Sequence, residues 1–435
     1  MRKGEKAESM SVLLDKILDQ ENINLALKNV KANKGSGGVD NITINEIDDY
    51  MLANWESVKK QIQERTYKPQ PVRRVEIPKP NGGVRKLGIP TIVDRVIEQA
   101  ITQILSPICE PYFSDYSYGF RPNRSCEQAI IRLLDLFNDG FIWVVDIDLE
   151  KFFDNVPQDR LMSLVHNIIN DGDTESLIRK YLQAGVMVNG QIEKSNLGTP
   201  QGGNLSPLLS NIMLNELDKE LESRGLNFVR YADDCIIVVK SHASANRVIH
   251  SITSWIERKL GLKVNMTKTH ITTPNKLKYL GFGFWKDNSG QYKARPHEDS
   301  IQKFKRALKK LCERKWSVDL SYRIKKLNEV IRGWINYFAI GFMKKHLSKI
   351  DEHLRTMLRI IIWKQWKVPS KREWGLKKLG IDKDLAKTTA NMGDHYMWIV
   401  TRTCVSRAIS KEKLTKKGLV SCLDYYLQRH TLKMN

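Results

Sequence analysis

Residues 229–236 read Val229-Arg230-Tyr231-Ala232-Asp233-Asp234-Cys235-Ile236, an adjacent pair of carboxylates inside an otherwise apolar, β-branched stretch. The apolar runs on either side predict a β-hairpin over residues 228–239 with the two acids at its tip. Two neighbouring anions repel each other unless a cation lies between them, and magnesium, which prefers carboxylate and phosphate oxygens, is the natural candidate. The alternative is a polar hairpin turn, because Asp is common in turns.

A second source of carboxylates lies upstream, where a predicted buried strand over residues 142–148 carries Asp146 and Asp148 at its end. A strand that ends in an acid, placed beside a hairpin that ends in two, can hold two metal ions roughly 3.5–4 Å apart. One ion would activate an attacking hydroxyl, and the other would stabilise a pyrophosphate leaving group. A strand-end Asp is also common without any metal.

A glycine-rich loop precedes a predicted helix over residues 207–225. The loop reads Gly198-Thr199-Pro200-Gln201-Gly202-Gly203-Asn204-Leu205-Ser206-Pro207. Its glycines allow the backbone to approach a ligand closely, Gln201 can donate and accept hydrogen bonds, and Pro207 suits the start of a helix. The alternative is a plain loop before a helix.

The predicted elements change in kind along the chain. Residues 72–90 read as a hairpin that bears basic side chains, and strands are expected at residues 264–272 and 277–284. From about residue 300 onward only helical periodicity is present. The pattern therefore predicts an α+β body that ends near residue 290, followed by an all-helical region.

The chain has 435 residues and a formal net charge of +22, and the excess charge lies in its last third. Residues 1–290 hold 37 Lys and Arg against 36 Asp and Glu, whereas residues 291–435 hold 34 against 13. Such a field favours a polyanion, and nucleic acid is the commonest polyanion in the cytoplasm. An acidic membrane surface is a weaker option, because Trp and Tyr residues interleave the basic ones.

The composition argues against several other classes of protein. No run of 18 apolar residues is present, so no transmembrane helix is expected. The N-terminal residues MRKGEKAESM lack an apolar signal core, so a cytoplasmic location is expected. The six cysteines are scattered without CxxC spacing, which encodes neither a zinc knuckle nor a disulfide framework.

In their order, these segments resemble the conserved blocks of reverse transcriptases, specifically the reverse transcriptase/maturase proteins encoded by bacterial group II introns. The blocks cover about residues 70–285 and are Ile77-Pro78-Lys79-Pro80 with Leu87-Gly88-Ile89-Pro90 and Asp94-Arg95, Tyr118-Gly119-Phe120-Arg121-Pro122, the Asp148 segment, Thr199-Pro200-Gln201-Gly202-Gly203, Tyr231-Ala232-Asp233-Asp234, Leu262-Lys263-Val264-Asn265 with Lys268-Thr269, and Tyr279-Leu280-Gly281-Phe282.

The resemblance continues beyond the polymerase blocks. Residues 331–338 (IRGWINYF) resemble the family's maturase, or X, signature, and the basic residues 366–435 resemble its DNA-binding region. The Cys and His pairs of an HNH-type nuclease are missing, as in the class C intron proteins, so cleavage of the DNA bottom strand by this chain is not expected.

The resemblance implies a right-hand polymerase fold of the α+β class. Fingers and a palm with an antiparallel sheet would be followed by an all-helical thumb and a basic C-terminal domain. The expected domains are an N-terminal extension (1–60), the reverse transcriptase fingers and palm (61–290), the thumb or maturase X domain (291–365) and the basic DNA-binding D domain (366–435).

The resemblance also implies roles for individual residues. The catalytic and metal-binding positions are Asp148, Asp233 and Asp234, which would hold two Mg²⁺ ions. In the family the aspartate of the first acidic block lies five residues before the aromatic that guards the sugar, and this relation selects Asp148 over Asp146. That aromatic is Phe153, which would collide with a 2′-hydroxyl. The nucleotide-binding positions are Lys79, Arg85, Phe153, Gln201 and Gly202. Lys268 is a candidate proton donor to pyrophosphate, with a structural or template role as the alternative.

The function that the resemblance implies is that of an RNA-directed DNA polymerase and maturase. It would bind its parent group II intron RNA, assist splicing, and copy the intron into DNA during retrohoming. Its partners would be that RNA, an RNA template with a DNA primer, target DNA and dNTPs, with no membrane; a homodimer stays open. The alternatives are a splicing-only maturase, against which the intact aspartates speak, and a domesticated relative in phage defence or beside a CRISPR array.

Overall fold

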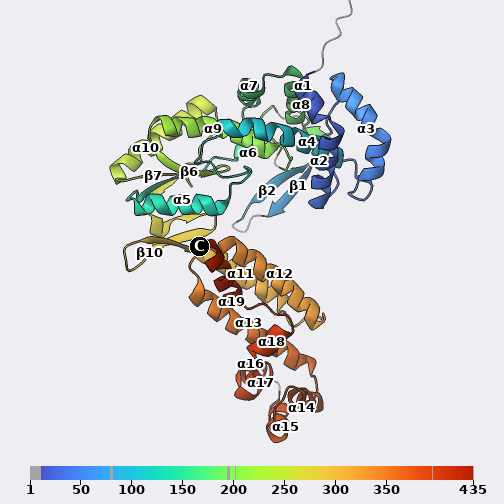
Figure 1. Cartoon of the computed structure of the whole chain (residues 1–435), viewed down its shortest axis with the longest axis vertical. Helices are drawn as coiled ribbons and strands as arrows, with labels where there is room; N and C mark the ends of the chain where they lie inside the picture. The colour runs from blue at the N-terminus through green and yellow to red at the C-terminus, as the bar shows by residue number, and fades with distance from the viewer. Residues whose placement is uncertain (1–10, 79–81, 194–195, 201, 394, 435) are drawn as a thin grey trace, which may run out of the picture. The chain divides into compact units, whose positions relative to one another are not determined.

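The chain is described by a computed structural model over residues 11–78, 82–193, 196–200, 202–393 and 395–434. It divides into two compact units, residues 1–273 and 274–435 (Figure 1). Lys79 and Gln201, which the resemblance assigns to the nucleotide site, lie outside the described residues. Within the described part, no helix is long and apolar enough to cross a bilayer.

The palm of the first unit is a four-stranded sheet in the order β6-β7-β3-β8, in which every neighbouring pair is antiparallel. Helix α9 (Ser206–Ser223) precedes β6, and helix α10 (His242–Trp255) joins β7 to β8. This is a split βαβ arrangement. The strands are β3 (Trp143–Ile147), β6 (Asn227–Tyr231), β7 (Asp234–Val239) and β8 (His270–Thr272).

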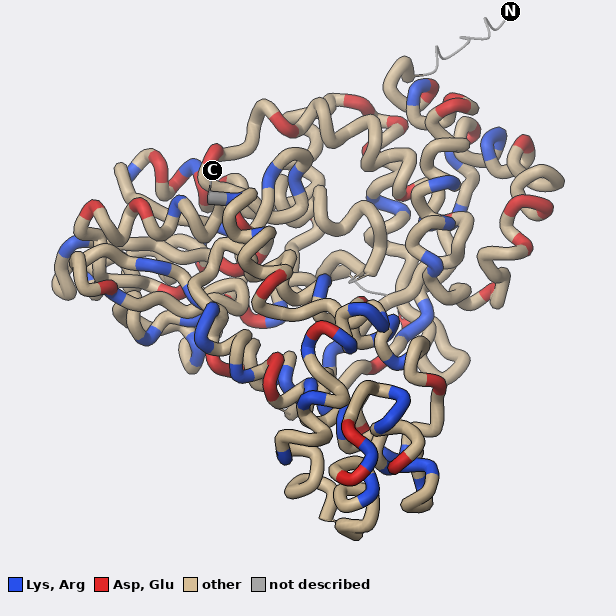
Figure 2. Tube along the Cα trace, turned by 60° about the horizontal axis from the view of Figure 1, so that its bottom comes forward, with Lys and Arg blue, Asp and Glu red and all other residues tan. Residues whose placement is uncertain are grey.

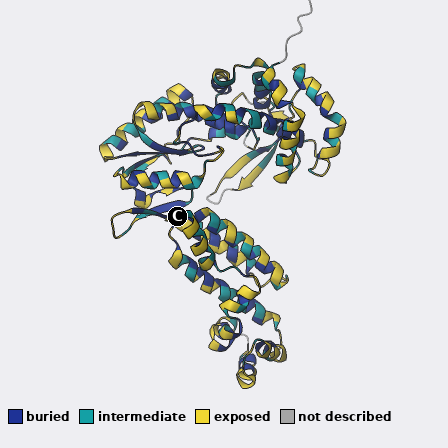
Figure 3. Cartoon of the chain, in the orientation of Figure 1, coloured by how far each residue is buried: buried dark blue, intermediate teal, exposed yellow. Residues whose placement is uncertain are grey.

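The central palm strands are buried because helices pack against them. Residues 235–239 of β7 are all buried, and they form one apolar run, as expected for a strand covered on both faces. Helix α10 packs against β3, β7 and β8, while α9 and α5 (Cys126–Asn138) pack against β6. Figure 3 shows the buried residues concentrated in these strands and on the inner faces of the helices.

The fingers contain a second sheet, in the order β2-β1-β4-β5. Its hairpin pairs Arg74 with Gly88 and Glu76 with Lys86, so these four residues share one face. Arg85 lies one residue before Lys86 and is therefore on the other face. The strands are β1 (Val72–Pro78), β2 (Val84–Ile89), β4 (Val186–Val188) and β5 (Gln191–Glu193).

Helices complete the first unit around a shared apolar core. Among them is the largely buried and apolar α4 (Ile92–Cys109), which starts at the cap Thr91. The others are α1 (Val12–Ile17), α2 (Gln20–Ala32), α3 (Ile47–Gln63), η1 (Glu110–Tyr112), α6 (Phe152–Asn155), α7 (Gln158–Ile169), α8 (Gly172–Leu182) and the π-helical turn η2 (Ile256–Leu260).

The second unit starts with a small sheet and continues as helices. Its core includes Phe304 and Trp334, whose rings stack with centroids 4.4 Å apart. Its Lys and Arg residues outnumber its Asp and Glu residues, and Figure 2 marks the two kinds in blue and red along the trace. The elements are η3 (Pro274–Lys276), β9 (Lys278–Tyr279), β10 (Phe282–Lys286), β11 (Tyr292–Pro296), α11 (Glu298–Leu311), α12 (Leu320–Phe338), α13 (Lys344–Gln365), α14 (Pro369–Lys378), α15 (Lys383–Ala390), α16 (Tyr396–Thr401), α17 (Thr403–Ala408), α18 (Lys411–Lys416) and α19 (Cys422–Met434).

One expectation about these elements differs from the structure. The strand expected at 264–272 is confined to β8 and one bridge from Val264, because the Asn265 side chain accepts a hydrogen bond from the Thr267 N–H and closes a turn. The compact units divide after Thr273, whereas the last strand, β11, ends at Pro296 and, within the described residues, only helices follow it. Strands β9–β11 pair with one another and form a sheet separate from the palm.

Candidate active site

The carboxylate pair lies at the tight turn between β6 and β7. Tyr231 and Asp234 are the last paired residues, which leaves Ala232 and Asp233 as a two-residue loop. Ala232 has a φ of 58°, a left-handed conformation that the turns of twisted hairpins require at their first central position. The structure therefore places both acids at the hairpin tip.

Buried contacts hold this turn in place. The Arg230 guanidinium donates to both carboxylate oxygens of Asp218 at 2.5 and 2.7 Å, to Asn211 Oδ1 at 3.1 Å, and to the carbonyl oxygen of Ala232 at 2.8 Å. Gly119 packs so closely against the turn that a Cβ there would lie 2.3 Å from the Ala232 nitrogen. The turn before Asp233 is thus positioned by a buried charge pair and by a glycine from a distant part of the chain.

Asp148 follows β3 and is held by the irregular segment 265–269. Its N–H donates to Thr269 Oγ1 at 3.0 Å, and its carbonyl oxygen accepts from the Asn265 N–H at 2.8 Å. The Lys268 ammonium donates to Asp148 Oδ2 at 3.3 Å. The structure therefore brings the candidate proton donor directly to the first aspartate.

The carboxylates of this site influence one another. Burial, followed by the Asp148 charge, raises the pKa of Asp233, while Arg85 acts in the opposite direction. Although part of the Asp234 side chain is exposed to solvent, the surrounding protein and then the charges of Asp233, Asp146 and Asp148 raise its pKa to about 7. Asp146, whose pKa burial raises to about 6, adds to this negative field.

Hard oxygen donors that repel one another fit a divalent cation, which would relieve the repulsion. In the described part of the chain, no three His, Cys, Asp or Glu side chains are yet close enough together to hold a metal ion. The Asp148 carboxylate is instead in contact with Lys268. The donor chemistry of Asp148, Asp233 and Asp234 therefore fits the ion, and their side chains would have to close around it.

A pocket of about 370 Å³ lies between the β1–β2 hairpin, the turn after β3 and the glycine-rich loop, and none of the three aspartates lines it. Arg74 and Lys86 line it from the hairpin, and Lys151 and Phe153 line it from the turn. The half-buried Phe153 packs edge-on against Phe152, with ring centroids 5.2 Å apart. The lining thus combines cations and one aromatic ring with two acids, Asp154 and Glu193.

The structure separates the predicted fingers residues. Arg85 does not line this pocket and acts on Asp233 instead, whereas Lys86, its neighbour in sequence, does line the pocket. Lys86 and Lys151 were not singled out from the sequence. The alternation of side chains along β2, together with its register against β1, is the signal that identifies Lys86.

Glu98 of α4 holds the glycine-rich loop and is another residue that the sequence patterns do not reveal. Its carboxylate accepts from the Asn204 N–H at 2.6 Å, and a Cβ on Gly203 would lie 2.7 Å from one of its oxygens. Gly202, with a φ of 126°, approaches the Gly88 carbonyl of β2 in the same way. The available signal was an acid inside an apolar helix.

Two family models match the chain. Residues 77–284 match the model described as reverse transcriptase (RNA-dependent DNA polymerase), and residues 301–380 match the group II intron, maturase-specific domain. The palm sheet, the acids at its hairpin and the first match together define the reverse transcriptase class of polymerases.

The relatives fall in the same group. Protein YkfC of Escherichia coli (strain K12) is 33% identical over 55% of this chain and 72% of its own length. The group II intron-encoded protein LtrA of Lactococcus lactis subsp. cremoris is 38% identical over 52% of this chain and 38% of its own length. A putative COX1/OXI3 intron 2 protein of Saccharomyces cerevisiae is 30% identical over 64% of this chain and 39% of its own.

The chain thus spans about two fifths of LtrA and of the yeast protein. A chain of the partial Cas6-RT-Cas1–Cas2 complex covers 57% of this chain and 43% of its own at 24% identity, with a TM-score of 0.37, too low to support a functional statement. The chain belongs to the family of group II intron-encoded reverse transcriptases that carry a maturase domain. Reverse transcriptases generally use divalent metal ions.

Proposed function

We propose that the chain is an RNA-directed DNA polymerase that copies RNA by metal-assisted nucleotidyl transfer and also binds its parent intron RNA as a maturase. The observation that carries the proposal is the grouping of Asp148, Asp233 and Asp234 around the palm hairpin, where the charge of the fingers residue Arg85 acts on Asp233. Acids at the palm hairpin and cations at the fingers are what a triphosphate and its metal ions require.

In this proposal two magnesium ions, held by the three aspartates, supply activation of the primer hydroxyl and stabilisation of the pyrophosphate. The protein's own residues perform the positioning. Arg85, whose charge already acts on Asp233, binds the triphosphate from the fingers side, and Phe153 lies under the sugar and rejects a 2′-hydroxyl. Lys268, which contacts Asp148, donates a proton to pyrophosphate in this proposal, with a structural or template role as the alternative.

Binding of intron RNA is assigned to the basic second unit. A hollow of about 450 Å³ between α11 and α13 is lined by Lys305, Lys309 and Lys349, and all three are exposed. Further along, the Arg402 guanidinium lies 3.8 Å from the ring centroid of the exposed Trp398. Charge for the phosphates and a few stacking surfaces are the contacts by which RNA is commonly bound.

The proposal includes the remaining expectations from the sequence. The partners are the intron RNA, an RNA template with a DNA primer, target DNA and dNTPs, the ions are two Mg²⁺, and the location is the cytoplasm. The domain limits stay at 1–60, 61–290, 291–365 and 366–435. Nucleotide contacts by Lys79 and Gln201 are part of it on the resemblance alone.

Primer extension on poly(rA)/oligo(dT) with Mg²⁺ tests the proposal. The wild-type chain should extend the primer, and Asp233→Ala should abolish the product while leaving the affinity for intron RNA unchanged. Asp159→Ala, which removes an exposed acid on α7, is the control and should be fully active. A wild-type chain that binds intron RNA but makes no Mg²⁺-dependent product would establish the splicing-only alternative.

A further inference from the structure

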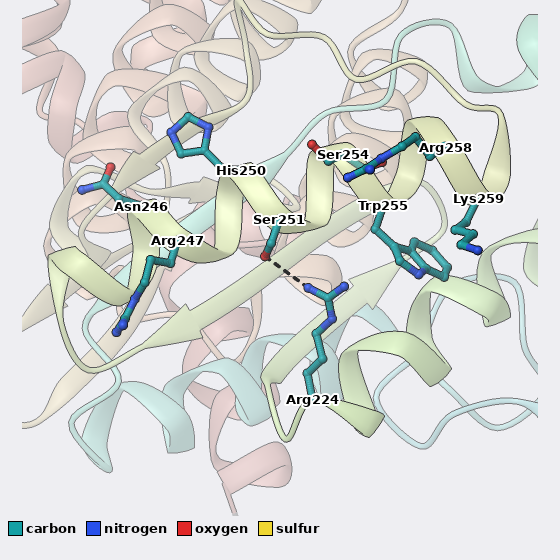
Figure 4. Close-up of a pocket in the computed structure, with 9 residues that line it drawn as sticks. All are labelled: Arg224, Asn246, Arg247, His250, Ser251, Ser254, Trp255, Arg258 and Lys259. Carbon is teal, nitrogen blue, oxygen red and sulfur yellow. Dashed lines mark hydrogen bonds between the residues drawn. The ribbon is translucent and has the colours of Figure 1, made fainter.

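An open hollow of about 960 Å³ lies between α10 and the turn that joins α9 to β6 (Figure 4). Its lining includes Arg224, Arg247, His250, Trp255, Arg258 and Lys259, and no carboxylate lines it. Figure 4 shows Arg224 reaching from the turn toward α10, where it donates to Ser251 Oγ at 3.1 Å. We call this hollow the α10 groove.

The cations of α10 and η2 follow one side of a continuous helical segment. At 3.6 residues per turn, Arg247, Ser251 and Ser254 of α10 fall on one face, and Arg258 follows in the π-helical turn η2. The α-helical part from Arg247 to Trp255 alone rises by about 12 Å. The groove therefore presents a line of hydrogen-bond donors and not a single point of charge.

Several of these charges have no carboxylate partner. In the part of the chain that the structure describes, no ion pair engages Arg247, Arg258 or Lys259; Arg247 donates to Ser244 Oγ at 3.3 Å, and Arg258 donates to the Ser254 carbonyl oxygen at 3.2 Å. Arg224, in contrast, pairs with Glu220 at 2.5 Å. The groove thus keeps three exposed cations available for a ligand.

Neither overall composition nor helix stability accounts for this lining. Residues 1–290 are nearly neutral, with 37 basic against 36 acidic side chains, so a lining with four cations and no acid is a local departure. Arg258 and Lys259 suit the negative end of the helix. Arg247 is two turns or more from that end, and Arg224 belongs to another element, so the dipole explains neither.

We propose that the α10 groove binds the phosphate backbone of an RNA strand outside the polymerase cleft. The inference rests on the proposed function, which supplies a long RNA partner. Phosphates are typically contacted by Arg and Lys together with Ser and Asn donors, and Ser251, Ser254 and Asn246 line the groove. The half-buried Trp255 adds an aromatic surface on which an unpaired base can stack.

The groove is separate from the catalytic turn. Arg224 lies three residues before the start of β6, whereas Asp233 follows its end, and a five-residue strand spans about 13 Å between its first and last Cα atoms. None of the residues that line the groove lines the nucleotide pocket. RNA in the α10 groove would therefore add affinity without touching the reacting atoms.

The test uses the full chain and a long, labelled single-stranded RNA. The variant R247E/R258E is compared with R160E/K60E, which reverses two exposed cations on other helices of the same unit. Because two phosphates would no longer be neutralised, the slope of log K against log salt should fall by about 1.4, and affinity at moderate salt by about tenfold or more. The control should keep the wild-type slope, and both variants should keep wild-type primer extension on a short template.

A local readout identifies the ligand. A photo-crosslinking residue at Asn246, which lines the groove, should crosslink the RNA, whereas one at the exposed Asn167 of α7 should not. Equal slopes for both double variants, or equal crosslinking at both positions, would overturn the inference. If no RNA crosslinks at Asn246 and the groove binds polyglutamate instead, the inference is wrong and the ligand is an acidic protein. If the wild-type chain itself extends no primer, only the proposed polymerase function is contradicted. The salt slope and the crosslink both measure RNA binding and would still test the groove.

Discussion

At the scale of single residues, Arg230 decides the geometry of the catalytic turn. It and Asp218 have no exposed side-chain surface, and the guanidinium also donates to the carbonyl of Ala232, next to Asp233. A buried ion pair adds little net stability, because both ions lose their hydration. Removing one partner, however, leaves the other charge buried and unpaired, which is costly. The Arg230–Asp218 pair is therefore better explained by its role in orienting the turn than by a contribution to the stability of the fold.

Arg230→Ala should lower the free energy of unfolding by about 3–5 kcal/mol, because Asp218 is left buried without a partner. Urea denaturation measures this loss, and Arg179→Ala, which breaks an exposed pair with Asp159, should cost less than about 1 kcal/mol. The double variant R230M/D218L should recover most of the stability but not DNA synthesis, since the hydrogen bond to Ala232 is missing. Full synthesis by that variant would contradict the positioning role.

Phe153 is the second decisive residue, because its ring lines the pocket where the sugar is expected. Phe153→Ala should allow ribonucleotides to be incorporated, since the obstacle to a 2′-hydroxyl is removed. The measurement is the ratio of kcat/KM for dATP and ATP on a poly(rU)/oligo(dA) template. Phe152→Leu, which changes the buried neighbouring ring, is the control. An unchanged ratio in Phe153→Ala would exclude the steric role.

At the scale of elements, α4 supports the glycine-rich loop through one carboxylate. Glu98 accepts from the backbone at Asn204, just before α9 begins, so two distant segments meet at a single side chain. The two glycines of the loop are needed for different close approaches, one to Gly88 of β2 and the other to Glu98. The pocket that Phe153 lines thus depends on the packing of three elements.

Gly203→Ala should disturb this loop, because the new Cβ would lie 2.7 Å from a Glu98 oxygen. We expect a loss of about 1–3 kcal/mol in the free energy of unfolding and a higher KM for dNTPs. Gly333→Ala is the matched control: nothing lies near its Cβ, and in a helix alanine should stabilise by about 0.5–1 kcal/mol. A normal KM in Gly203→Ala would show that the loop does not shape the nucleotide pocket.

The same side chain predicts a dependence of stability on pH. Burial, followed by the charge of Asp94, raises the pKa of Glu98 to about 8. The folded state therefore retains a proton that the unfolded chain releases near pH 4.3, so this contribution is complete below about pH 4 and is lost as the pH rises through about 8. Between about pH 5 and pH 9 the wild type should lose on the order of 3 kcal/mol more than Glu98→Gln, which does not titrate. The free energy of unfolding is measured by urea denaturation at both pH values. An equal change in this free energy for the wild type and Glu98→Gln would contradict the prediction.

At the scale of the whole molecule, charge is divided between the two parts of the sequence. The nearly neutral residues 1–290 contain the aspartates, and the strongly basic residues 291–435 contain the exposed lysines of the hollow between α11 and α13. Mutations should therefore be able to change the affinity for RNA without changing the rate of DNA synthesis, and the reverse.

The variant K305E/K309E/K349E should bind intron RNA at least about tenfold more weakly at moderate salt, with a salt slope lower by about 2, because three phosphates would no longer be neutralised. Its unfolding midpoint should not change, since all three side chains are exposed. Filter binding over a salt series measures both the affinity and the slope, and K28E/K60E/R160E in the other unit is the control. An equal loss of affinity in the control would mean that total charge, and not this surface, determines binding.

The sequence by itself was sufficient for the features that consecutive residues encode. The hairpin with Asp233 and Asp234 at its tip, the strand before Asp148 and the helical, basic last third all follow from local patterns of apolar and charged residues, whereas the antiparallel palm followed from the family resemblance. Those patterns were sufficient because a strand or helix is decided mainly by residues close in the chain.

Only the tertiary structure decided which distant groups meet. Lys268 contacts Asp148 across 120 positions, Glu98 holds a loop 106 positions away, and Arg224 faces α10 across 27. A shift of one residue in β2 decides whether Arg85 or Lys86 lines the pocket. Such pairings depend on register and packing, which no local pattern specifies, and they place both the candidate catalytic acids and the α10 groove.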